Sequence, residues 1–168
     1  MQEQQKKKTA KPQIEDVIHD AVKDERRQAA LDFVGFIRSL KMTPAWASKN
    51  SWEVSYKGQT LCYIRTAGTA HYHGLDDGSW HINFAAYSDY VYDVPVSDED
   101  IEAIAGKARY CKKCYNCAPA NSLTINGKEL SKICHQWLIV KNPDAHELDC
   151  MKKLVVAIRQ SIADKNIK

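Results

Sequence analysis

The chain has 168 residues, 44% of them hydrophobic, which is the size of one ordinary domain with enough apolar residues for a core. Its formal net charge is +3, and residues 1–11 supply all of it, so the remaining chain is formally neutral. This distribution argues against specific nucleic-acid binding, because such domains carry their basic excess on the folded surface. No stretch approaches the roughly 20 apolar residues of a membrane-spanning helix, which argues against a membrane partner.

We expect residues 1–11 to be a disordered basic tail and residues 12–168 to form a single domain. No apolar segment follows the N-terminal lysines, so no secretory leader is indicated. Six cysteines in such a chain predict the reducing cytoplasm, where thiols serve as metal ligands or core residues more often than as disulfides.

Two amphipathic helices are expected after the tail. Pro12 suits the first turn of the first one, and Pro44 lies just beyond the end of the second, within residues 25–41. Apolar residues at helical spacing define one face of each: Ile14, Val17, Ile18 and Val22, then Ala30, Phe33, Val34, Ile37 and Leu40.

Strands follow the helices. Residues 52–65 alternate apolar and polar around Lys57 and Gly58, which predicts a hairpin, and a third strand is expected from Trp80 to Phe84. Ser97 and Asp100 then have the spacing of a capping box at the start of a short helix, with Gly106 as its stop.

The C-terminal part repeats the alternation of hairpin and helix. Asn126 and Gly127 predict a second hairpin turn, Asn142 is expected to cap the last helix, and Pro143 suits its first turn. The fold class is therefore α+β: two N-terminal helices, an antiparallel sheet from two hairpin-containing units, a short middle helix and a long C-terminal helix. The core face of that last helix is predicted to hold Leu148, Met151, Leu154, Val155, Ile158 and Ile162.

The strongest chemical signal is a cysteine cluster in the loop at residues 107–135. Cys111, Cys114 and Cys117 are spaced C-x2-C-x2-C, and Cys134 is expected on the returning strand of the second hairpin. A C-x2-C turn can present sulfurs about 3.7 Å apart, as tetrahedral Zn–S bonds of about 2.3 Å require. These four cysteines predict a structural zinc ion. His135 is excluded as a ligand because neighbouring strand residues point to opposite faces.

Three alternatives stay open for these cysteines. An iron–sulfur cluster is less well supported, because the Cys-Pro pair typical of such sites is absent at both Cys117 and Cys134. A site using only one of Cys111 and Cys117 would leave an open position on zinc and could be catalytic. The thiols could also be unmetallated or oxidise in pairs.

Histidines and aromatic residues near the first sheet form a weaker ligand-facing hypothesis. His71 and His73 share a face of any extended segment, with Asp76 and Asp77 nearby, and His81 follows on the next strand. Tyr63, Trp80 and other aromatic residues of this sheet could line a small-molecule cavity, although core packing is the commoner role. A surface loop is the commoner setting for the two histidines.

Four segments of the chain resemble a group of small bacterial α+β proteins of uncharacterised function with a C-terminal cysteine cluster. These segments are ALDFVGFIRSLKMTP, SWEVSYKGQTLCYI, GSWHI and the run from GKEL through CHQWLIVKNPDA, and they span most of residues 25–160. The resemblance implies the α+β fold and no activity. The segment GTAHYHGLDD before Ser79 departs from it, so its histidines receive no role.

Two functional hypotheses follow. The chain is either a zinc-stabilised module that binds a small ligand or a protein, or a metalloenzyme or iron–sulfur redox protein that uses the same cysteines. No nucleophile elbow, phosphate loop, dinucleotide fingerprint or HExxH motif is present, so the sequence does not indicate a particular reaction. A zinc closed by four thiolates favours the first hypothesis, and an exchangeable water or visible absorption favours the second.

Overall fold

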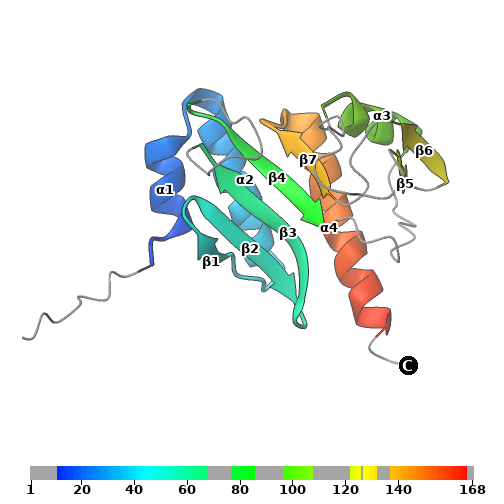
Figure 1. Cartoon of the computed structure of the whole chain (residues 1–168), viewed down its shortest axis with the longest axis horizontal. Helices are drawn as coiled ribbons and strands as arrows, with labels where there is room; N and C mark the ends of the chain where they lie inside the picture. The colour runs from blue at the N-terminus through cyan, green and yellow to red at the C-terminus, as the bar shows by residue number, and fades with distance from the viewer. Residues whose placement is uncertain are drawn as a thin grey trace, which may run out of the picture.

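The computed structural model describes residues 11–67, 77–85, 97–107, 122–125, 127–131 and 137–165. These residues form helices and antiparallel strands in the order of an α+β protein (Figure 1). In chain order the elements are α1 (Ile14–Ala21), α2 (Asp24–Ser39), β1 (Ala45–Ser48), β2 (Ser51–Tyr56), β3 (Gln59–Thr66), β4 (Trp80–Ala85), α3 (Asp98–Lys107), β5 (Ser122–Ile125), β6 (Lys128–Ser131), β7 (Trp137–Lys141) and α4 (Ala145–Lys165).

The main sheet has five antiparallel strands in the order β1-β2-β3-β4-β7, and β5 and β6 form a separate two-stranded sheet. The predicted fold class is confirmed. The second hairpin-containing unit, however, contributes only β7 to the main sheet. β1 was not predicted from the sequence, because its four side chains are all exposed at the sheet edge and lack the alternation that marks a half-buried strand.

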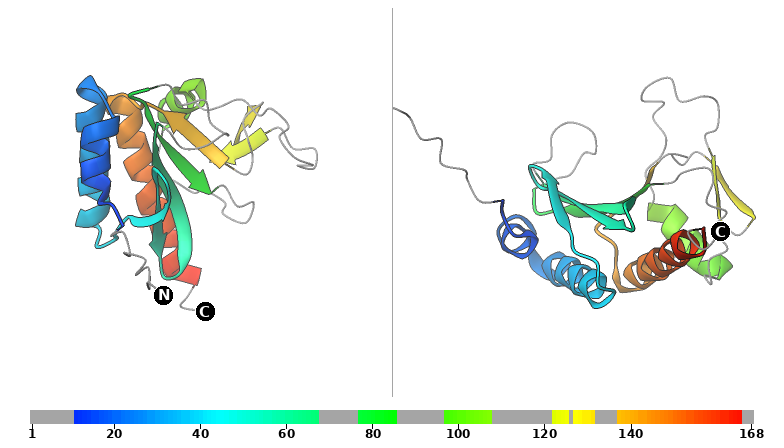
Figure 2. Two further views of the ribbon diagram at one scale, coloured as in Figure 1. Left: turned by 60° about the vertical axis from the view of Figure 1, so that its left-hand side comes forward. Right: turned by 90° about the horizontal axis from the view of Figure 1, so that it is seen from below.

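Helices α1, α2 and α4 cover one face of the main sheet (Figure 2). That face carries the apolar residues of alternate strand positions, and the register aligns Trp52, Ile64, Ile82 and Val140 across four strands. All of them are buried, together with Phe33 and Ile37 of α2 and Met151, Leu154 and Ile158 of α4. The core therefore lies between the helices and the sheet, as the spacing of apolar residues predicts.

One local feature of the C-terminal part differs from the sequence-based expectations. Helix α4 begins after Asp144, not after Asn142, whose φ of 45° is left-handed and whose side-chain oxygen accepts a hydrogen bond from the Trp80 N–H at 3.0 Å. Asn142 thus joins the end of β7 to the start of β4. The described part of β6 ends at Ser131, and Cys134, predicted on the returning strand of the hairpin, lies outside the described residues.

The start of β4 is held by a close approach between two backbone segments. Val22, at the end of α1, forms an isolated parallel bridge with Gly78, and the Lys23 N–H donates to the Gly78 carbonyl at 3.3 Å. Gly78 has a φ of +79°, and a Cβ built there would lie 2.9 Å from a side-chain carbon of Lys23. Glycine therefore meets both the conformational and the steric requirement at this position.

Candidate metal sites

The N-terminus of α3 places a carboxylate beside the core. Ser97 is the N-cap residue: its hydroxyl accepts the Asp100 N–H at 3.1 Å, and Asp100 Oδ2 accepts the Ser97 N–H at 3.0 Å. This reciprocal pair is the capping box predicted from the sequence, with Asp in the position that Glu usually takes. The helix continues one residue beyond Gly106, to Lys107. The box fixes the orientation of the Asp100 carboxylate.

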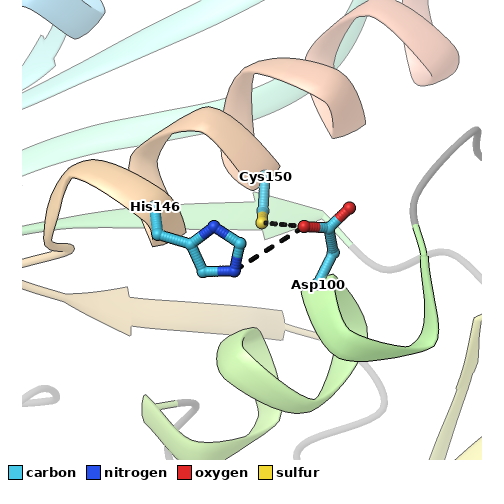
Figure 3. A group of neighbouring side chains, drawn as sticks. All are labelled: Asp100, His146 and Cys150. Atoms are coloured by element: carbon cyan, nitrogen blue, oxygen red, sulfur yellow. Dashed lines mark hydrogen bonds and ion pairs between the residues drawn. The ribbon is translucent and has the colours of Figure 1, made fainter.

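A second capping box starts α4. Asp144 Oδ1 accepts the Glu147 N–H at 2.9 Å, and Glu147 Oε2 accepts the Asp144 N–H at 2.8 Å. Because α4 begins here, His146 and Cys150 are four residues apart within the helix and share one face. The first turns of α3 and α4 lie close together, so this face of α4 meets Asp100 (Figure 3).

Asp100 is the centre of a polar network between the two helices. The Cys150 thiol donates to Asp100 Oδ1 at 3.2 Å, and His146 Nε2 lies 3.7 Å from the same oxygen (Figure 3). Lys153 Nζ donates to the other oxygen, Oδ2, at 3.2 Å, and also lies 3.5 Å from Asp149. The side chain of Asp100 is 8% exposed, and that of His146 is 55% exposed.

The protonation states of this network follow from its contacts. Hydrogen bonds from the Ser97 backbone and the Cys150 thiol lower the pKa of Asp100 well below its usual range. Burial, and then the hydrogen bond to Asp100, raises the pKa of Cys150 to about 12. The hydrogen bond to Asp100 raises the pKa of Lys153. At neutral pH the network therefore holds a carboxylate, a neutral thiol and an ammonium, and Cys150 is not an activated nucleophile.

The same three side chains have the composition of a metal site. One ligand atom each from Asp100, His146 and Cys150 lies within 4.8 Å of the other two. Oxygen, imidazole nitrogen and thiolate sulfur are the three protein ligand types of zinc. The sequence contains one signal for this group, the i, i+4 spacing of His146 and Cys150. Asp100 could not be added from sequence, because only the packing of α3 on α4 brings it there.

The predicted zinc ligands Cys111, Cys114, Cys117 and Cys134 lie outside the described residues, as do His71 and His73. Described elements flank these cysteines in the chain. Helix α3 ends at Lys107, the two-stranded sheet occupies the segment between Cys117 and Cys134, and β7 begins at Trp137.

The remaining ligand-facing candidates lie on opposite faces of the main sheet. Trp80 is buried, with its ring centroid 6.3 Å from that of Phe33 on α2, so it belongs to the helix-covered core. Tyr63 and His81 occupy the alternate strand positions and belong to the other face. The Arg65 guanidinium lies 5.0 Å from the centroid of the Tyr63 ring on that face.

Comparison with models of protein families, with curated proteins and with solved structures gives no significant match. No helix in the described parts of the chain is long and apolar enough to cross a bilayer.

Proposed function

We propose that this protein is a zinc-binding α+β module in which Cys111, Cys114, Cys117 and Cys134 hold a structural zinc ion, and that it binds a small molecule or another protein in the reducing cytoplasm. The proposal rests on the spacing of the cysteines and on one structural observation. That observation is the small sheet of β5 and β6, which, within the described residues, is separate from the main sheet.

A two-stranded sheet is marginally stable on its own in water. The described contacts of this sheet with the rest of the protein include two side chains of β6. Leu130 is buried in the common core, and Lys128 Nζ lies 2.6 Å from Glu102 Oε1 on α3. Glu102 is 70% exposed, and solvent screening leaves such an exposed ion pair with little net effect on stability. A further source of stability is therefore expected for this segment.

A tetrathiolate zinc site would supply that stability. Three of the cysteines precede β5 in the chain and the fourth follows β6, so one ion would tie both ends of the small sheet together. Zinc binding adds bond energy and reduces the freedom of the unfolded chain. Four thiolates around Zn²⁺ leave a local charge of about −2. Four nearby basic residues in the sequence would offset this charge: Lys107, Arg109, Lys112 and Lys113.

The face of the main sheet away from the helices supports the binding role. Its register aligns Ser51, Arg65, His81 and Lys141 across four strands. Arg65 Nε donates to the Ser51 hydroxyl at 3.1 Å, which restrains the guanidinium group beside Tyr63. A few oriented polar groups on a rigid scaffold are typical of surfaces that recognise small ligands or peptides. Ser51 and His81 are buried in this row, whereas Arg65 and Lys141 are partly exposed, and these two basic side chains favour an anionic partner.

Elemental analysis of the full-length protein, produced in medium that contains zinc and iron, tests the proposed metal. We expect about one tightly held zinc ion at these four cysteines, and the Cys134→Ser variant should lose it. Cys62→Ser is the matched control, because Cys62 is a buried thiol of β3 that is not among the predicted ligands and should not affect zinc content. Full zinc retention by Cys134→Ser would refute the assignment. Iron with visible absorption in anaerobically purified protein would support the redox alternative instead.

A further inference from the structure

The contact between α3 and α4 has the geometry of a second metal site. Tetrahedral zinc with N and O ligands at about 2.0 to 2.2 Å and sulfur at about 2.3 Å separates its ligand atoms by about 3.3 to 3.8 Å. The Cys150 sulfur and His146 Nε2 lie 3.2 and 3.7 Å from Asp100 Oδ1, so two of the three separations already have about this length. The third is at most 4.8 Å, and the exposed His146 ring can close it by rotation.

We propose that Asp100, His146 and Cys150 bind a divalent transition-metal ion of the zinc class, with the fourth coordination position open to water or an exogenous ligand. This inference is additional to the structural zinc proposed at the cysteine cluster. Three protein ligands and one open position form the arrangement found in zinc sites that bind exchangeable ligands.

The two carboxylate oxygens of Asp100 have different partners. Oδ1 faces the thiol and the imidazole, whereas Oδ2 accepts hydrogen bonds from the Ser97 N–H and from Lys153. A metal ion on Oδ1 therefore leaves the helix cap and the lysine contact in place. Hydrogen bonds to the second oxygen of a ligating carboxylate orient it toward the metal, as outer-shell partners do in established sites.

The charges of the site also fit a divalent ion. On metal binding the Cys150 S–H bond breaks, its proton leaves to solvent, and the sulfur electron pair forms the bond to the metal ion. The resulting thiolate and the Asp100 carboxylate carry two negative charges, which match M²⁺. Lys153 remains 3.2 Å from the carboxylate as an outer-shell cation. Without metal, Cys150 keeps its proton, so no second negative charge lies beside the Asp100 carboxylate.

The three proposed ligands differ in their exposure to solvent. The side chain of His146 is 55% exposed, whereas Asp100 is nearly buried and Cys150 is fully buried. A metal ion would thus meet the imidazole first and then the two inner ligands. Two of the ligands lie on one rigid helix, four residues apart, and the third is fixed by a capping box, so little chain entropy is lost when the ion binds.

Cadmium NMR of the full-length protein, loaded with isotopically enriched Cd²⁺ alone, tests this site. The resonance of bound cadmium moves strongly downfield with each thiolate ligand, so a tetrathiolate site and a site with one sulfur give well-separated signals. We expect both signals in the wild-type protein. His146→Ala should lose only the signal of the site with one sulfur, called here the mixed-ligand signal. His19→Ala, which removes an exposed histidine from α1, should keep both signals.

The possible outcomes test the two proposed metal sites separately. A tetrathiolate signal alone, or a mixed-ligand signal that survives in both His146→Ala and Cys150→Ser, overturns the second site and leaves the structural zinc standing. A mixed-ligand signal alone supports the second site and refutes the tetrathiolate assignment. The absence of both signals refutes both. Because His146 is exposed, its variant should fold, and the amide spectrum of each sample verifies this.

Discussion

The main sheet and the small sheet are held in the fold by different means. β2, β3, β4 and β7 present one continuous apolar face to α1, α2 and α4, and the core residues on it are almost completely buried. Among the described residues, β5 and β6 form a strand ladder only with each other, and their described core contribution is Leu130. The comparison shows that burial of apolar surface accounts for the first region, whereas the second depends on local tethers.

The largest expected effect comes from breaking the core under the main sheet. Phe33→Ala should lower the free energy of unfolding by about 3 to 5 kcal/mol, because it removes a fully buried ring that contacts Trp80. Phe36→Ala is the matched control: its partly buried ring is on the same helix and should cost clearly less. Urea denaturation measures both variants. Equal losses would show that the α2 contact with β4 is not a main source of stability.

Removal of metal should affect the small sheet selectively. With a strong chelator, we expect amide hydrogen exchange to become at least about tenfold faster in residues 107–140, because the zinc tether there is lost. Exchange in α1, α2, β2 and β3 should change little, since their protection comes from core burial. Hydrogen exchange with mass spectrometry resolves these regions. Uniform loss of protection would mean that the whole chain is one cooperative unit, and no change would mean that the cysteines hold no structural metal.

Asp100 joins α3, which precedes the small sheet in the chain, to α4, and its removal is expected to have an intermediate effect. Asp100→Asn should cost about 1 to 2 kcal/mol at pH 7, because it weakens the cap of α3 and the contact with Lys153. Glu99→Gln removes an equal charge from the same exposed first turn and should change stability by less than about 0.5 kcal/mol.

The effect of Asp100 should depend on pH in a defined direction. Its folded-state pKa lies below the ordinary value of 3.8, so its stabilisation is present above about pH 4 and is lost as the pH falls toward the folded-state pKa. The difference between wild type and Asp100→Asn should shrink correspondingly in acid, as measured by urea denaturation from pH 7 to pH 2. A difference that grows in acid would contradict the assigned contacts.

The smallest effect is expected at the N-terminus. Deletion of residues 1–11 should change stability by less than about 1 kcal/mol, because this segment has no apolar periodicity. The one described contact in it places Lys11 Nζ 5.8 Å from the centroid of the exposed Trp46 ring, and such an exposed cation–π pair contributes about 0.5 to 1 kcal/mol. Thermal denaturation checks this. A fall of more than a few degrees would show that the tail contributes to the fold.

The sequence predicted the regular elements well where one local pattern was sufficient. The apolar spacing of α1, α2 and α4, the turn at Lys57 and Gly58, and the capping box at Ser97 are all present in the structure. Asn142 was assigned wrongly because an Asn before Pro has the composition of a helix cap, and only the tertiary contact with β4 reveals its role.

Functional residues that come together only through tertiary contacts were likewise not recognisable from the sequence. A cluster of cysteines close in sequence is visible in the chain, and it produced the zinc prediction. Asp100 and His146 are separated in the chain by β5, β6 and β7 and come together only because α3 packs on α4 (Figure 3). The alternation of Tyr63 and His81 with core residues was visible, but it did not determine which sheet face the helices would cover.

The strand order also indicates where the length of the chain can vary. β4 and β7 are hydrogen-bonded neighbours, yet residues 86–136, including α3 and the small sheet, lie between them in the chain. This segment is therefore an insertion between adjacent strands. The entropy of closing such a loop grows slowly, by about 0.6 kcal/mol for each doubling of its length. The length of this segment can thus change at little cost to the pairing of β4 with β7 where the core contacts of α3 and Leu130 are kept, so this part of the fold can acquire new binding functions while the main sheet is retained.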